Sequence, residues 1–587
     1  MASLVSALKK HTPKQLGENG SVEHAWSFDI KEKIVQLFFQ LVRTKDTDSL
    51  KNQLRQVLGY FKGKEYDNHE DLTLLYKMIG QTRDVVNGKG EWSLTYMLIY
   101  EWFQFYPELA KEALSLCVMP ETAIVDMVEV EQHPYGSWKD IKYFCNYVKE
   151  QCGTEFHELI LFATDLMVKQ LNNDWEQYNV NGSQTGEHKS LSLAAKWCPR
   201  QGSKRFSWIY KRIAKQTFEH YIKTSKNDTS LKRAKSKCYR EMRQRLSTMN
   251  RYLDTTQIKM CEKTWRDIDF KNVTSLTMMK SNKAFNNKDK KGNVRHHSFD
   301  RIQCSNNLNE HIELAKEGKT NVKAKRCNVY ELVKMVLEGN NDDLTNEMWK
   351  SNSTNNGGLG NVVSVVDTSG SMKVDECLPL YNAIGLGIRI SEKASEPFKN
   401  MFITFHSTPE IVTLNPDLTF VQKVRQTARA NWGGSTNFMA TFNLLLEVAI
   451  DNEIPPSEME DLVLAVFSDM QFDQAGNENY NTIIDTIKIK YATAGLNSKF
   501  GQPYKVPHIL FWNLRKTEGF PCISTDRNVT MLSGYSSTLL NLFCEKGIEE
   551  LKGCTPYKML CELLNHERYL PMEKLAHDTF SLWSNIE

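Results

Sequence analysis

The chain has 587 residues, which is long enough for at least two domains, because single hydrophobic cores stop growing at roughly 250–300 residues. Hydrophobic residues make up 41% of the chain and charged residues 25%, which are ordinary values for a globular protein. The net charge of +3 indicates no class of partner, although charge is unevenly distributed along the sequence.

The sequence indicates an intracellular, cytoplasmic protein. The N-terminus contains no long apolar segment of the kind found in secretory signals. The longest apolar patches, near residues 97–102 and 362–366, are far shorter than the roughly 20 residues of a membrane span, so no membrane partner is expected. Thirteen cysteines are scattered without a CxxC pair, which favours reduced thiols over a disulfide framework or a zinc site.

The first half of the chain has helical periodicity. Apolar residues recur at three- and four-residue steps from Ser27 to about Cys117, and further helical segments continue to Leu337. Successive helices joined by short loops favour an α-solenoid or bundle, although no clean repeat period is evident. We expect residues 1–26 to form an N-terminal tail and residues 27–338 an all-α helical-repeat domain.

A Gly-Lys-Gly-Glu sequence at residues 88–91 resembles a phosphate-binding loop. It lacks the GxxxxGK[ST] spacing and follows a helix rather than a strand. A corner between two helices is the better interpretation.

Residues 200–245 form a strongly basic segment, with fifteen Lys or Arg against three acidic residues, a net charge of +12. Six aromatic residues lie among these charges. Because basic residues neutralise phosphates and aromatic rings stack on bases, RNA is a candidate partner; the alternative is a solvated helix face whose aromatics belong to the core. The candidate nucleic-acid-binding residues are Lys204, Arg205, Lys211, Arg212, Lys215, Lys232, Arg233, Lys235, Lys237, Arg240 and Arg243.

The second half alternates strand and helix after a break in composition. Residues 339–360 are rich in Asn, Ser and Gly and are predicted to be a linker. Apolar runs at residues 361–366, 400–405, 461–467 and 508–513 then alternate with helical patterns. This order is typical of an α/β doubly wound sheet, expected over residues 361–587 together with a C-terminal helical tail.

Three separated segments of this α/β half carry matching chemistry. The strand at residues 361–366 is followed by Asp367, Ser369 and Ser371, a Gly-Gly loop precedes Thr436, and a second apolar strand precedes Asp469. Carboxyl ends of parallel strands meet at one edge of a sheet, where ligands bind. Oxygen ligands with one or two carboxylates suit Mg²⁺, and an acidic group from a partner protein could complete its coordination.

These residues resemble the metal-ion-dependent adhesion site of von Willebrand factor A domains, in which D-x-S-x-S, a distant Thr and a second Asp surround one cation. The resemblance implies a Rossmann-like domain that binds Mg²⁺, or Mn²⁺ or Ca²⁺, through Asp367, Ser369, Ser371, Thr436 and Asp469. Some domains that keep this motif use it for their own architecture, or bind no metal.

The whole chain looks more remotely like the Ro autoantigen (TROVE) proteins, where a ring of helical repeats binds RNA. It is similar in more detail to an uncharacterised family that combines a TROVE-like helical half with such an A domain, through phrases such as Leu-Ala-Ala-Lys-Trp-Cys-Pro at residues 193–199 and Phe-Ser-Asp-Met-Gln-Phe-Asp at residues 467–473. Members occur in plants, fungi and large DNA viruses, so a virion location is consistent with the resemblance.

The sequence therefore leaves three classes of function open. The first is a nonenzymatic RNA-binding protein with a Mg²⁺-dependent docking site for a partner. The second is a protein–protein adaptor or a structural component of a virion that uses the metal site alone. The third, a metal-dependent hydrolase, is the weakest, because the sequence has no GxSxG motif, no Cys–His signature and no carboxylate cluster for two metals. No catalytic residue and no small-molecule substrate is evident.

Overall fold

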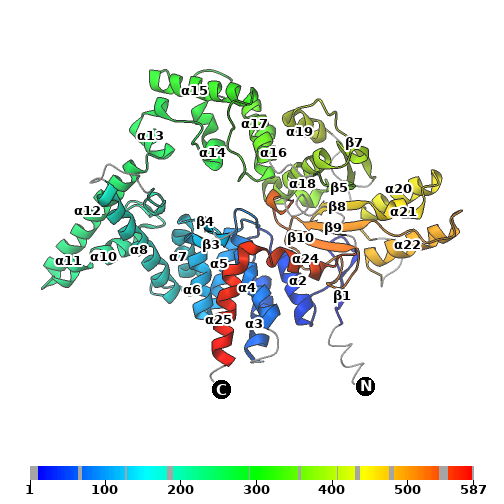
Figure 1. The fold of residues 1–587 in the computed structure, drawn as a ribbon, viewed down its shortest axis with the longest axis horizontal. Helices are drawn as coiled ribbons and strands as arrows, with labels where there is room; N and C mark the ends of the chain where they lie inside the picture. The colour runs from blue at the N-terminus through cyan, green and yellow to red at the C-terminus, as the bar shows by residue number, and fades with distance from the viewer. Residues whose placement is uncertain are drawn as a thin grey trace.

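The computed structural model describes residues 11–63, 69–125, 128–181, 190–289, 291–353, 358–405, 408–429, 436–474, 481–540, 551 and 553–584. These residues form a helical part and a six-stranded mixed sheet flanked by helices (Figure 1). Within the part of the chain described, no helix combines the length and apolar character that a bilayer crossing requires.

The chain begins with a small antiparallel hairpin and a block of packed helices. The expected apolar stripes are confirmed, since Ile34, Phe38 and Leu41 of the first stripe are all buried. A hairpin of alternating β-branched and acidic residues, β3–β4, interrupts the helices, which corrects the expectation of an all-α domain. The elements are β1 (Lys14–Leu16), β2 (Val22–His24), α2 (Ile30–Gln40), α3 (Asp48–Gly63), α4 (His69–Arg83), α5 (Trp92–Phe103), α6 (Pro107–Val118), β3 (Glu121–Val125), β4 (Val128–Gln132), α7 (Lys139–Cys152) and α8 (Glu158–Asn181).

The helical part leaves the sheet domain and returns to it. Helix α2 packs against the sheet strand β10 (Val529–Ser533), and α16 packs against α18 (Val374–Lys393). Between them, the cyan and green helices run outward to α11 and α12 and arch back through α13–α15 (Figure 1). This limb contains α9 (Ala194–Trp197), α10 (Ser207–Thr217), α11 (Glu219–Lys223), α12 (Asp228–Tyr252), α13 (Thr256–Glu262), α14 (Ser275–Phe285), α15 (Phe299–Lys316), α16 (Val329–Leu337) and α17 (Asp342–Asn352).

Part of the expected linker is structured. Within residues 339–360, α17 begins at Asp342, with Asn341 as its N-cap, and buries Met348 and Trp349. The ring of Trp349 stacks on Phe420, with 3.8 Å between the ring centroids. The Asn-rich composition reflects helix capping and the sharp turns at the ends of α17, so a helix that packs on the sheet domain replaces the predicted flexible connection.

The sheet has the order β10-β9-β8-β5-β6-β7 and is parallel except for β7, which is antiparallel to β6. The predicted strands are confirmed to within about one or two residues. Strands β5, β8, β9 and β10 are buried along their whole length, which explains their continuous apolar runs. The strands are β5 (Val362–Asp367), β6 (Met401–Phe405), β7 (Glu410–Thr413), β8 (Val463–Ser468) and β9 (His508–Asn513), with β10 as above.

Helices cover both faces of the sheet, and the C-terminal helices return to the start of the chain. The helices around the sheet are α18, α19 (Phe420–Ala428), α20 (Phe438–Asp451), α21 (Pro456–Glu460) and α22 (Ile483–Asn497). Helices α24 (Pro556–Leu564) and α25 (Leu570–Ser584) pack against α4, and α25, drawn in red, lies beside it (Figure 1). The sequence also predicts a helix at residues 536–544, of which residues 541–544 lie outside the described residues and the described part contains a short 3-10 turn at Ser537–Leu539.

The corner at residues 88–91 joins the helical block to the sheet. Lys89 is buried and donates from Nζ to the carbonyls of Phe38 at 2.6 Å and Leu41 at 3.1 Å, and to the hydroxyl of Ser533 at 2.6 Å. Its ammonium therefore bridges α2 and β10. The corner between helices predicted from the sequence is present, and its lysine links the helical block to the sheet through hydrogen bonds.

Candidate cation site and basic helical surface

The candidate cation site lies where the direction of strand addition reverses. From β5 the chain adds β6 and β7 on one side, and β8, β9 and β10 on the other. The carboxyl ends of β5 and β8 therefore flank the crevice in which open α/β sheets bind ligands. In the parallel register Val366 lies opposite Phe467, so Asp367 and Ser468 end their strands at the same level.

Asp367 is fully buried at the end of β5. Ser468 donates its hydroxyl to Oδ2 at 2.5 Å, and the Ser369 backbone N–H donates to Oδ1 at 2.9 Å. The hydroxyl oxygens of Ser369 and Ser371 lie 3.0 Å apart, because the single turn at residues 370–373 brings them to one side. The structure thus brings three of the five predicted ligands together.

Asp469 is the second buried carboxylate at this edge. Its Oδ2 accepts from Nε of Arg515 at 2.9 Å, and its Oδ1 accepts from the Gln471 backbone N–H at 3.2 Å. Burial raises the pKa of Asp367 well above its usual range, and the negative charge of Asp469 raises it further. The two carboxylates are therefore close enough to repel each other, and a divalent cation between them would remove that repulsion.

Thr436 reaches the same edge from the loop that precedes α20. It is buried, and its carbonyl accepts from the Asp473 backbone N–H at 2.9 Å. This contact places Thr436 beside the segment that continues from Asp469. The Trp-Gly-Gly-Ser sequence at residues 432–435, which precedes Thr436 in the predicted motif, lies outside the described residues.

The N-terminal hairpin covers this edge, which sequence reasoning did not foresee. Glu18 binds both terminal nitrogens of Arg515, at 2.6 and 3.3 Å. Asn19 donates its amide to the Thr436 hydroxyl at 3.4 Å and to the Gln471 carbonyl at 2.8 Å. The Gly-Glu-Asn-Gly sequence at residues 17–20 is a recognisable turn signal, but nothing local indicates where such a turn docks.

The donor set fits a hard divalent cation. It consists of two carboxylates and the hydroxyls of Ser369, Ser371 and Thr436, all oxygen atoms of the kind that Mg²⁺ prefers. Asp367 receives hydrogen bonds from neutral groups only, whereas Asp469 has Arg515 as a counter-charge. Across the described residues, no group of three or more His, Cys, Asp or Glu side chains could hold a metal, so this site differs in kind from a zinc or dicarboxylate-cluster centre.

The basic segment forms α10, α11 and most of α12, at the outer end of the helical limb (Figure 1). Eight of the eleven candidate residues are exposed, and Arg212, Lys215 and Lys235 are half-buried. Nearby carboxylates pair with only part of this charge, as in the ion pairs of Arg205 with Glu150 and of Arg240 with Glu241.

The aromatic residues of this segment are directed inward. Tyr210 is buried and donates its hydroxyl to the Tyr239 carbonyl at 2.6 Å. Phe206, Trp208 and Phe218 are half-buried and pack against the hydrophobic core. The structure therefore favours the core interpretation of these rings, and leaves the exposed charges as the feature of α12 that could meet a polyanion.

The sequence predicts a second basic stretch, at residues 288–297, to be an exposed loop, and its described residues are exposed. Asp289 accepts backbone N–H groups from Lys291 and Asn293, both at 2.8 Å, and these hydrogen bonds close the turn and lower the pKa of the carboxyl. The neighbouring His296 and His297 are exposed.

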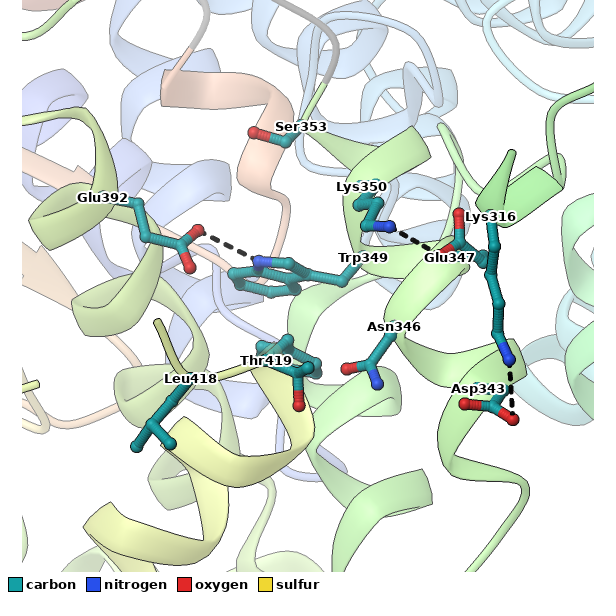
Figure 2. A pocket seen from close by; sticks show the side chains of 11 residues that line it. Lys316, Asp343, Asn346, Glu347, Trp349, Lys350, Ser353, Glu392, Leu418 and Thr419 are labelled. Atoms are coloured by element: carbon teal, nitrogen blue, oxygen red, sulfur yellow. Dashed lines mark hydrogen bonds and ion pairs between the residues drawn. The ribbon is translucent and has the colours of Figure 1, made fainter. Parts of the chain in front are cut away.

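A cavity of about 460 Å³ lies elsewhere, between α17 and α19. Figure 2 shows that its charged lining residues are engaged with neighbours: Lys350 with Glu347, and Lys316 with Asp343. Trp349 donates its indole N–H to Glu392 at 3.0 Å and stacks on Phe420. These contacts hold the helical limb against the sheet domain, and the cavity shares no residue with the candidate cation site.

Two family models match the chain. Residues 361–567 match a domain of unknown function, DUF7788, and residues 144–298 match a second domain of unknown function, DUF2828. The first match spans the sheet and the candidate cation site, and the second spans the basic segment. An uncharacterized protein of Acanthamoeba polyphaga mimivirus is 28% identical over 525 residues, which cover 87% of this chain and 82% of that protein. The expected similarity to uncharacterised proteins with viral members is confirmed.

Proposed function

We propose that this chain is a nonenzymatic binding protein with two binding parts. Residues 361–567 act as a von Willebrand factor A-like domain that docks a partner through a divalent cation, and the TROVE-like helical limb binds RNA. The strand order, with one antiparallel edge strand and both key carboxylates at the point where the order reverses, supports the first assignment.

The single observation that carries the docking function is the composition of the β5–β8 edge. Asp367 and Asp469 are both fully buried there, and hydroxyl groups lie beside Asp367. Two carboxylates leave a bound Mg²⁺ with room for one more acidic ligand, which a partner protein would supply. The partner is then recognised by an exposed carboxylate, and the cation acts as a bridge rather than as a catalyst.

Calorimetric titration with Mg²⁺ or Mn²⁺ tests this function directly. Wild-type protein should bind one ion, and Asp367→Asn should weaken binding by at least about tenfold, because it removes one of two ligand charges. Asp417→Asn, an exposed change on the same domain, is the matched control. If wild-type protein binds no divalent ion, the docking function is wrong.

A second observation favours RNA binding by the helical limb. The exposed cations of α12 run from Lys232 to Arg251, and the opposite side of the same helix, which carries Cys238, Met242, Leu246 and Met249, is packed inward. Binding to RNA should weaken steeply as salt is raised, because each neutralised phosphate releases counterions. If the protein shows no salt-dependent binding to RNA, the remaining proposal is an adaptor or a virion component. The similarity to a mimivirus protein is compatible with that alternative.

A further inference from the structure

Three lysines, two on α7 and one on α9, lie around one aromatic ring. The Nζ atoms of Lys142, Lys196 and Lys139 lie 5.0, 5.5 and 5.6 Å from the centroid of the Trp197 ring. Lys139 and Lys142 also lie 5.4 and 5.7 Å from the Tyr143 centroid. All three ammonium groups therefore lie around one ring, and Lys139 is near enough to Lys142 to act on its charge.

Among the described residues, no side chain forms an ion pair with these three lysines, and none of the three donates a hydrogen bond. The adjacent carboxylate of Asp140 accepts hydrogen bonds from the Arg83 guanidinium and from the Tyr96 hydroxyl. Burial lowers the pKa of each lysine, and neighbouring cations lower those of Lys139 and Lys142 further.

The position of two of these lysines is also unfavourable for the helix that carries them. Lys139 is the first residue of α7 and Lys142 lies in its first turn. The N-terminal end of a helix carries a partial positive charge, which favours acidic side chains and repels lysine. Stability of α7 does not explain lysines at both positions, whereas a bound anion would.

A row of aromatic rings, half-buried except for Trp92, continues from the lysines. Tyr143 lies 5.7 Å from Trp92 and 5.2 Å from Phe206, measured between ring centroids. Trp92 is 47% exposed, although it is one of the largest apolar side chains in the protein. Arg205 lies over the opposite end of this row, 5.4 Å from the Phe206 centroid.

We propose that this basic–aromatic patch, made of Lys139, Lys142, Lys196 and Trp92 around Tyr143 and Trp197, binds single-stranded RNA. The lysines hold backbone phosphates, and the exposed indole of Trp92 stacks on a base. Cations interleaved with accessible rings are the pattern by which proteins bind single strands without reading sequence. The inference rests on the proposed RNA-binding function and assigns its main contacts to α7 and α9 rather than to α12.

The test compares two triple variants of the full chain that lose the same charge. The patch variant carries Lys139→Gln, Lys142→Gln and Lys196→Gln, and the control carries Lys232→Gln, Lys235→Gln and Lys237→Gln in α12. Binding of a fluorescein-labelled oligouridylate of about 20 nucleotides is measured over a range of salt concentrations. The patch variant should bind at least about tenfold more weakly and lose about two units of the salt slope, and the control should lose less than about threefold.

A third variant, Trp92→Leu, separates stacking from charge. Tryptophan fluorescence of the wild type should be quenched by the RNA, and this variant should lose both part of the quenching and about tenfold in affinity. Far-ultraviolet circular dichroism verifies that each variant is folded. If the α12 control loses as much affinity as the patch variant, or more, the assignment to the patch is overturned while RNA binding stands. If wild-type protein does not bind the oligonucleotide, the proposed RNA-binding function falls with it.

Discussion

Arg515 lies against Asp469, with its Nε 2.9 Å from a carboxylate oxygen that is fully buried at the carboxyl edge of the sheet. The same guanidinium binds Glu18 of the N-terminal turn through its two terminal nitrogens. One permanent positive charge therefore stands between a buried carboxylate of the candidate cation site and an exposed carboxylate of the segment that covers it. The positive charge of Arg515 offsets the negative charge of Asp469 whether or not a cation is bound.

Replacing Arg515 with Ala should destabilise the protein and make its stability depend on Mg²⁺ more strongly than that of wild type. Without the guanidinium, Asp469 keeps a buried charge with no organic counter-ion, at a cost of roughly 3 kcal/mol. A bound divalent ion would recover part of this loss through mass action. Urea unfolding in EDTA and in excess Mg²⁺ measures both effects.

The double variant Arg515→Ala with Asp469→Asn is the control for this prediction. It removes the uncompensated charge, so it should recover stability in EDTA and lose the Mg²⁺ effect. Equal stability of Arg515→Ala in EDTA and in Mg²⁺ would contradict the view that a cation binds beside Asp469.

The N-terminal turn should restrict access to the candidate cation site. Glu18→Gln with Asn19→Ala removes the ion pair to Arg515 and the amide contacts to Thr436 and Gln471. We expect amide hydrogen exchange at residues 17–20 to accelerate at least about tenfold, because the backbone N–H of Glu18 donates to the Gln471 side chain at 2.6 Å in the docked turn.

Lys14→Gln is the matched control. Lys14 lies on the same hairpin, and the change removes its exposed contact to Asp485, which is away from the edge of the sheet that holds the candidate cation site. If the turn limits access, the double variant should also bind a soluble acidic peptide in Mg²⁺ more tightly than wild type does. Unchanged exchange at residues 17–20 would show that the hairpin is held by other contacts, such as the packing of Trp26 on Phe520.

Lys89→Ala should destabilise the contact between the helical block and the sheet. The substitution leaves the carbonyls of Phe38 and Leu41 without the buried donor that bridges α2 and β10, and we expect a loss of about 2–4 kcal/mol in unfolding free energy. Chemical denaturation followed by circular dichroism measures it. Lys45 is exposed in the same region of the sequence, and Lys45→Ala should change the unfolding free energy by less than about 0.5 kcal/mol. If Lys45→Ala costs as much as Lys89→Ala, the buried bridge of Lys89 has no special role in stability.

His508 should make folding weaken in mild acid. Burial lowers the pKa of His508 to about 4, because the buried site disfavours the charged imidazolium; the hydrogen bond with Asn528 opposes this shift only in part. Between about pH 6.5 and pH 4 the unfolded chain binds a proton that the folded chain does not, so the unfolding free energy falls by roughly 3 kcal/mol as pH falls through this window.

His508→Gln should remove this component, so the stability of the variant relative to wild type should rise as pH falls. Urea unfolding at several pH values across the window measures the difference, with the exposed His297→Gln as control. Parallel pH profiles for wild type and His508→Gln would contradict the assignment of a neutral, buried His508.

Much of the fold could be predicted from local patterns. Continuous apolar runs identified β5, β8 and β9, because strands buried on both faces need no polar alternation. The β3–β4 hairpin was missed because it is short and lies among helices, and α17 was missed because capping residues gave its sequence the composition of a linker.

The candidate cation site, too, could be predicted from the local sequence only in part. Asp367, Ser369 and Ser371 are close in sequence, so one strand end and one turn suffice to bring them together. The adjacency of β5 and β8 could be inferred from the alternating pattern of strands and helices. The contact of Glu18 with Arg515 joins residues 497 apart, and no periodicity, cap or turn signal records such a pairing.

The amino-acid sequence by itself determined the class of each half, the strands of the sheet and the identity of the oxygen donors at its edge, because these depend on the spacing of apolar and polar residues over a few turns or strands. Only the tertiary structure decided that the N-terminal turn covers this edge, that the aromatics of the basic segment are turned inward, and that Lys139, Lys142 and Lys196 gather around Trp197. Those arrangements depend on which distant surfaces become neighbours when the core closes, and charge or aromaticity acquires a partner only after that packing is complete.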